Sequence, residues 1–142
     1  MFDDVEAQLQ DHLKEQLPTE VHVLTTADLA GAKESSQPTP AVHLVYQRYQ
    51  VTETKPGGMV CRIRQIWLAV IAVRNVRDIR RGQAARNQAT ELARLTAQAL
   101  MGFKPASATK PLTLVNAPQA SYQAGHQYLP LAFAVETVLK AH

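Results

Sequence analysis

The sequence has a single cysteine, Cys61, so no intramolecular disulfide can form. Such a composition suits a protein that folds in a reducing cytoplasm. Cys61 lies in a strand-like run with no partner motif nearby, which favours a packing role over a catalytic thiol. The chain must therefore rely on a hydrophobic core. Its 142 residues suffice for one domain spanning residues 1–142, because chains of this size bury about 68–70% of their unfolded surface.

Long hydrophobic runs are also missing. The longest strongly apolar segment covers residues 66–73, far short of the ~20 residues that a membrane-spanning helix requires. The chain begins Met-Phe-Asp-Asp, and no basic stretch leads into an apolar segment near this start. We therefore expect no membrane partner and no secretory signal peptide.

Motifs that support chemistry are absent as well. No two histidines have the spacing HxxxH, and none lies beside a CxxC pair, so the sequence predicts no zinc site. No serine occurs in GxSxG or SxxK, and no glycine-rich segment matches GxGxxG or the phosphate-binding GxxxxGK[ST]. These absences predict a protein that is not an enzyme, with no catalytic residues, no metal and no cofactor. The histidines considered are His12, His22, His43, His126 and His142.

Charge is unevenly distributed along the chain, although the total is only 15 basic against 12 acidic residues. Residues 1–36 are acidic, whereas residues 62–86 are strongly basic and contain one carboxylate, Asp78. Such asymmetry can attract nucleic acid, or it can form a complementary contact between subunits. Aromatic residues do not interleave with the arginines, which argues against an RNA-binding sheet with stacked bases. The candidate contact residues are Arg74, Arg77, Arg80, Arg81 and Arg86.

Hydrophobic periodicity predicts a helix at the start of the chain and a long β-hairpin in the middle. Val5, Leu9, Leu13 and Leu17 recur at helical spacing before Pro18. β-rich segments occupy residues 41–51 and 59–74, separated by a turn rich in glycine and threonine. Between helix and hairpin we expect a short strand at residues 21–24 and a loop at 29–39 that is too polar to pack.

The second half of the chain predicts a second long helix and two more strands. A stripe of small residues indicates a helix over residues 82–101, ended by Gly102. Strands are expected at residues 112–115 and 128–139, with a turn-rich excursion over 116–125. The fold class is therefore α+β: a mostly antiparallel sheet of four to five strands, with a long central hairpin and two main helices packed on it.

The strand at residues 66–73 is apolar on both faces. Ile66, Leu68 and Val70 alternate with Trp67, Ala69 and Ile71. A strand of this kind has to be covered on both sides, either by helices or by a neighbouring subunit.

The order of these segments resembles the tail terminator, or tail completion, proteins of long-tailed bacteriophages and prophages. The resemblance covers nearly the whole chain and depends on pattern, without a diagnostic catalytic motif. The matching segments are the acidic first helix, Thr-Pro-Ala-Val-His-Leu-Val-Tyr at 39–46, the strand beginning Ile-Trp at 66–73, Ala-Leu-Met-Gly-Phe at 99–103, and Tyr-Gln-Ala-Gly-His-Gln-Tyr-Leu-Pro-Leu-Ala-Phe at 122–133.

The resemblance implies a structural virion protein that forms a ring, typically a hexamer, on the last layer of a completed tail tube. That ring would stop tube polymerisation and present the surface that joins tail to head. The implied partners are other copies of the chain, the tail tube protein and a head-completion or connector protein, with DNA only passing through the ring. The implied locations are the bacterial host cytoplasm during assembly and then the virion tail.

Two other functions remain open from the residues alone. A nucleic-acid-binding domain could use the basic segment Arg74–Arg86. A small-molecule-binding domain is the second alternative, because a sequence does not reveal pockets. We also expect residues 30–39 and 53–59 to be poorly ordered in the isolated subunit and to become ordered on assembly.

Overall fold

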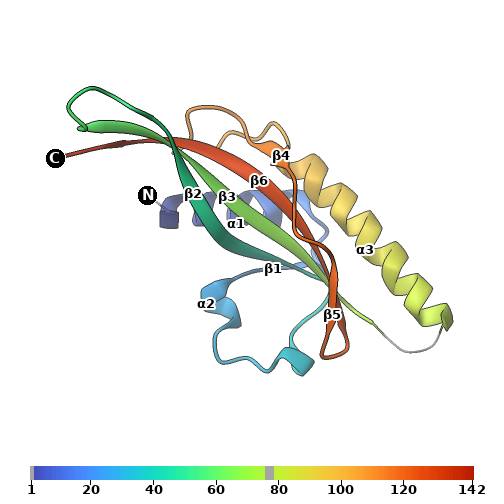
Figure 1. The fold of residues 1–142 in the computed structure, drawn as a ribbon. Helices are drawn as coiled ribbons and strands as arrows, with labels where there is room; N and C mark the ends of the chain where they lie inside the picture. Colours follow the sequence, from blue (N-terminus) through green and yellow to red (C-terminus); the bar gives the residue numbers. More distant parts are fainter. Residues whose placement is uncertain (1, 76–78) are drawn as a thin grey trace.

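The structure is a computed structural model that describes residues 2–75 and 79–142. A twisted sheet is its central element, and the helices α1 and α3 lie along one face of it (Figure 1). In chain order the elements are α1 (Phe2–Gln16), β1 (His22–Thr25), α2 (Thr26–Leu29), the 3-10 helix η1 (Glu34–Ser36), β2 (Ala41–Thr54), β3 (Val60–Arg74), α3 (Ile79–Leu100), β4 (Thr113–Val115), β5 (Ser121–Gln123) and β6 (His126–Lys140).

The described sheet has six strands in the order β1-β2-β3-β6-β4, and β5 pairs with one end of β6. Only β1 and β2 run parallel, and the other pairs are antiparallel. The predicted α+β class, the long central hairpin and the two main helices are therefore confirmed. The sixth strand is β5, which was predicted as part of a turn-rich excursion. Its three residues are all exposed and carry no burial pattern, so only pairing with β6 identifies them as a strand.

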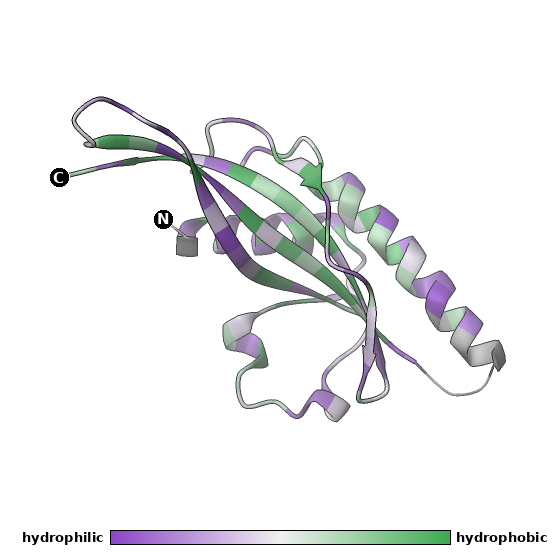
Figure 2. Cartoon of the chain, viewed as in Figure 1, coloured by the Kyte–Doolittle hydropathy of each residue, from purple (hydrophilic) through white to green (hydrophobic). Residues whose placement is uncertain are grey.

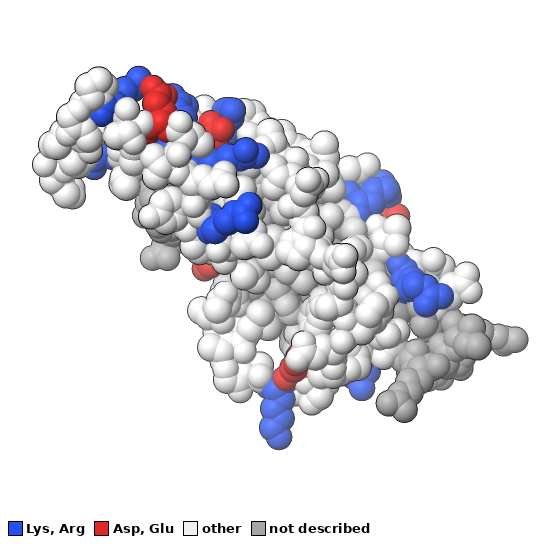
Figure 3. Space-filling view, in the orientation of Figure 1, with Lys and Arg blue, Asp and Glu red and all other residues white. Residues whose placement is uncertain are grey.

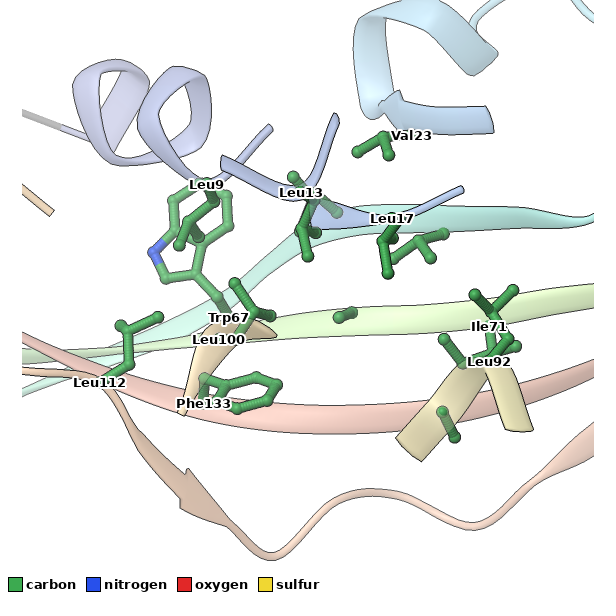
Figure 4. Close-up of a cluster of buried hydrophobic side chains, with 14 of the residues drawn as sticks. Leu9, Leu13, Leu17, Val23, Trp67, Ile71, Leu92, Leu100, Leu112 and Phe133 are labelled. Carbon is green, nitrogen blue, oxygen red and sulfur yellow. The ribbon is translucent and has the colours of Figure 1, made fainter. Parts of the chain in front are cut away.

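The core lies between the sheet and the two long helices (Figure 4). The apolar stripe predicted for the first helix is buried there, from Val5 of α1 at 0% exposure to Leu17, just after α1, at 6%. From the sheet, Trp67 and Phe133 face the helices, and α3 contributes Leu92 and Leu100. Helix α3 begins at Ile79, three residues before the predicted start, and is followed by Gly102 at a φ of +80°. This left-handed conformation is the usual end of a helix and favours glycine.

The opposite face of the sheet, which we call the open face, carries a second and smaller apolar cluster. Ile66 of β3 packs there with Ala132 and Ala134 of β6, and Leu68 and Val115 beside them stay partly exposed. Neither α1 nor α3 covers this face (Figure 1). Green, hydrophobic positions are frequent along the strands in Figure 2, and the register places Ile66, Ala132 and Ala134 among them on this face. The prediction that β3 is apolar on both faces is therefore confirmed. The long helices α1 and α3 cover one of these faces and leave the open face uncovered.

The segment at 29–39 is mostly exposed but is attached to the sheet at Gln37. It contains η1, and Gln37 is buried with 9% exposure. Its amide donates a hydrogen bond to the hydroxyl of Tyr128 at 2.5 Å. Glu34 accepts a second hydrogen bond, donated by the same hydroxyl, at 2.7 Å, whereas residues 30–36 are exposed, as expected of a polar loop.

Candidate functional site

Three strands extend beyond the helices at one end of the sheet. We call this projection the arm. It consists of residues 48–54 of β2, Met59 and residues 60–64 of β3, and residues 136–140 of β6. Figure 1 shows it at the upper left, next to the C-terminus. The two long strands of the hairpin supply most of it. The turn between them holds together through a hydrogen bond from the amide of Lys55 to the carbonyl of Val60 at 2.8 Å.

The helix-side face of the arm is apolar and open to solvent. Strand register places Val51 opposite Ile63 and Leu139 opposite Cys61, on the face that continues from Trp67. Whereas Ile63 is buried, Val51 is 55% exposed and Leu139 is 47% exposed. Met59 at the tip and Tyr49 near the root are 54% and 53% exposed. Exposed apolar residues grouped in this way are typical of interaction surfaces.

The other face of the arm is charged. Glu53 forms ion pairs with Lys55 at 2.8 Å and with Arg62 at 3.7 Å. The hydrogen bond from Lys55 is the main reason that the pKa of Glu53 is lowered. Lys110 approaches Glu136 to 3.2 Å. In Figure 3 charged side chains gather on the arm, whereas the middle of the face in view is almost uncharged.

Buried hydrogen bonds hold the strands together where the arm leaves the core. The indole of Trp67 donates to Gln65 Oε1 at 2.9 Å, and Gln65 Nε2 donates to the hydroxyl of Thr137 at 3.3 Å. Gln65 and Thr137 are 0% and 1% exposed. Tyr46 meets the edge of Trp67 with 5.5 Å between ring centroids. Because a one-residue slip would leave these buried groups unpaired, the network favours one register for the arm.

A pocket of about 460 Å³ lies on the open face. Its walls come from the α2–η1 segment and from residues 118–121, which places it at the end of the sheet away from the arm (Figure 1). The floor is mostly apolar, with Leu68, Val70 and Pro130 among its residues. The other lining residues are Leu29, Ala32, Lys33, Glu34, Gln37, His43, Pro118, Gln119, Ser121 and Tyr128.

Tyr128 ties the loop wall of this pocket to its floor. The hydroxyl of Tyr128 accepts from Gln37 at 2.5 Å and donates to Glu34 Oε1 at 2.7 Å. Burial, and then the hydrogen bond to Glu34, raise the pKa of Tyr128 to about 12. The phenol therefore stays protonated over the physiological range and keeps its donor role.

Two buried histidines flank Tyr128, with ring centroids 6.2 Å away for His43 and 6.1 Å away for His126. The Nδ1 of His126 is 3.1 Å from the carbonyl of Ala124. The Nε2 atoms of both rings are buried without a hydrogen-bond partner among the described residues. Burial lowers the pKa of His43, and the neighbouring His126 lowers it further. The neutral form of the His43 ring is therefore favoured at this site.

The candidate arginines lie around the connection from β3 to α3. Arg74 ends β3 opposite His126 and is exposed, and Arg86 is exposed on α3. Arg80 and Arg81 fall in the first turn of α3, but their side chains lie outside the described part of the structure. Arg77 lies outside the described residues altogether. The arginine segment therefore starts at the pocket end of the sheet, and its contact role stays a prediction.

Within residues 2–75 and 79–142, no group of three or more histidine, cysteine, aspartate or glutamate side chains is arranged to hold a metal ion. Over the same residues, no helix is both long and apolar enough to cross a membrane.

A sequence model described as phage tail terminator protein matches residues 2–141, nearly the whole chain. The chain belongs to the phage tail terminator family. A search of curated protein sequences finds no significant match.

Membership makes this terminator a structural protein of phage tails, found in the virion tail and in contact with other tail and head-joining components. The two surfaces described above are its candidate contacts. Sequence reasoning identified the hairpin but missed the pocket, because its lining comes from strands and loops that are far apart in the chain. The one available signal was that His43 and Tyr128 lie in otherwise apolar runs, at residues 41–46 and 128–135.

Proposed function

We propose that this terminator forms a closed ring of six copies on the last layer of a completed tail tube. The ring stops further polymerisation of the tube protein and presents the surface that a head-completion or connector protein binds. DNA meets the ring only as it passes through the central opening. Assembly takes place in the cytoplasm of the bacterial host, and the ring then remains in the virion tail.

The observation that carries this proposal is the solvent-exposed apolar face of the arm in a chain of this family. Tyr49, Val51, Met59 and Leu139 are each about half exposed, although the strands that bear or directly follow them continue into the core. Burying apolar surface is the main driving force for association, at about 25 cal/mol per Å². The arm therefore supplies the apolar part of a contact between copies.

Charge would set the register of that contact. Exposed carboxylates on α1, including Asp4, Asp11 and Glu15, provide an acidic surface, and Arg74 and Arg86 mark the basic segment. A closed ring uses head-to-tail contacts, in which two different patches of one chain are complementary. Exposed charge pairs contribute only about 0–1 kcal/mol each, so assembly should weaken with salt without disappearing.

Charge reversal tests the proposal. We expect Arg80→Glu with Arg81→Glu to impair ring formation and tail completion, seen by negative-stain microscopy as tubes of uncontrolled length. The matched control is Arg94→Glu with Lys104→Glu, which reverses two exposed positive charges outside the segment. Circular dichroism checks that both variants fold. Normal rings and normal tube lengths with the first variant, at low and at high salt, would show that the arginine segment has no such role.

The two alternatives make different predictions. A nucleic-acid-binding domain would shift DNA or RNA in a gel at physiological salt, and the Arg80→Glu/Arg81→Glu variant would lose that shift. A ligand-binding domain would use the pocket, whose volume of about 460 Å³ lies within the usual range of small-molecule sites. Its floor is formed largely by aliphatic side chains and proline, which equally suits a protein side chain.

A further inference from the structure

We propose that the tip of the arm of one copy docks in the open-face pocket of the next copy. The inference rests on the proposed ring and names the two surfaces that meet in it. The leading residue is Met59 at the tip, followed along the arm by Val51 and Leu139 on its apolar face. The receiving surface is the floor formed by Leu68, Val70 and Pro130.

The position of the two surfaces in the fold makes a head-to-tail contact possible. The arm and the segments that line the pocket lie at opposite ends of the sheet (Figure 1). The apolar side of the arm faces the direction of the helices, whereas the pocket opens on the other side of the sheet. The arm of one copy can therefore cover the pocket of the next copy while both copies keep similar orientations. Repeating one such step gives a ring when the rotation closes.

The chemistry of the two surfaces also matches. A protruding apolar patch that fits an apolar hollow elsewhere on the same molecule produces a head-to-tail contact between copies. The charges of the arm lie on its other face, where Glu53 is already paired with Lys55 and Arg62. Burying the apolar face would therefore leave no charged side chain buried without a partner. The arm and the open face would then pack as two sheets do, through interleaved apolar side chains.

The charges near the contact are mixed, because Lys33 lines the pocket beside Glu34, and only the carboxylates are opposite in sign to the Lys55 ammonium. Lys55 lies in the turn of the arm, and Glu34 and Asp28 lie on or beside the loop wall of the pocket. Glu34 accepts a hydrogen bond from the hydroxyl of Tyr128, so the carboxylate of Glu34 already lies at the edge of the pocket. A rim pair of this kind sets register more than affinity.

Cysteine crosslinking tests the inference. In a Cys61→Ser background, Met59→Cys marks the arm tip and Ser121→Cys marks the pocket wall. Tails completed with the double variant are treated with a short bismaleimide crosslinker and analysed on a denaturing gel. Because each copy then carries both ends of the contact, we expect a ladder of covalent oligomers. An equal mixture of the two single variants should stop at the dimer, and each single variant alone should stay monomeric.

The matched control combines Met59→Cys with Gln16→Cys, an exposed position at the end of α1. It should give no ladder. Rings on tube ends without a ladder from the first pair would overturn the arm–pocket contact and leave the ring function standing. Tubes without rings and without a ladder would overturn both. A dimer from Met59→Cys alone, or a crosslink to the tube protein, would show that the arm tip has a different partner and would also overturn the inference.

Discussion

Replacing Tyr128 by phenylalanine should release the loop that forms one wall of the pocket. The substitution removes a single oxygen and keeps the ring. That oxygen accepts a hydrogen bond from Gln37 and donates one to Glu34. Both partners belong to the segment that was predicted, from its composition, to be poorly ordered in the isolated subunit.

The loss of stability depends on how much each hydrogen-bond partner of the Tyr128 hydroxyl is buried. Gln37 is 9% exposed, so its amide would remain buried without an acceptor, which costs about 1–3 kcal/mol. Glu34 is exposed, so its carboxylate returns to water at little cost. For a domain of this size we expect the melting temperature to fall by about 3–10 °C.

Hydrogen exchange and thermal unfolding together measure this effect. Exchange over residues 30–39 should accelerate in Tyr128→Phe while the amides of β3 stay protected. The control is Tyr122→Phe, since Tyr122 is 60% exposed and surface changes of this kind stay within about 0.5 kcal/mol. Equal melting temperatures and equal exchange for the two variants would refute the idea that the Tyr128 hydroxyl holds the loop in place. If residues 30–39 of the unmodified protein already exchange freely, the loop is poorly ordered as its composition predicts.

Two further substitutions test the core and the buried histidine. Phe133→Ala should lower the free energy of unfolding by about 3–5 kcal/mol because the ring is 1% exposed. Leu139→Ala, on the exposed arm, should change it by no more than about 0.5 kcal/mol. Urea unfolding compares the two variants, and similar midpoints would contradict the burial of Phe133. His43→Leu should flatten the pH dependence of stability. Since burial and His126 lower the pKa of His43, stability is fully present above the ordinary pKa of about 6.5 and declines as the pH falls below it, because the unfolded chain binds a proton that the folded site resists. Urea unfolding at pH 7.5 and 5.5 measures this, and an unchanged slope in the variant would exclude the assignment.

The sequence by itself determined the class of fold and its main elements, because these follow from local patterns. Val5, Leu9 and Leu13 recur at helical spacing and are buried as a stripe on α1. The alternation around Trp67 predicted a strand with two apolar faces, and both faces bear apolar clusters in the structure. The order of these segments was also enough for the resemblance that the family match confirms.

Tertiary structure alone decided where the candidate contact surfaces lie. Val51 and Leu44 are equally apolar in the sequence, yet Leu44 is 1% exposed and Val51 is 55% exposed, because the helices end before the strand does. Likewise, Gln37 and Tyr128 are 91 positions apart, and no local pattern predicts that they meet. Exposure and long-range contact depend on how elements pack together, so the arm and the pocket became visible only in the folded chain.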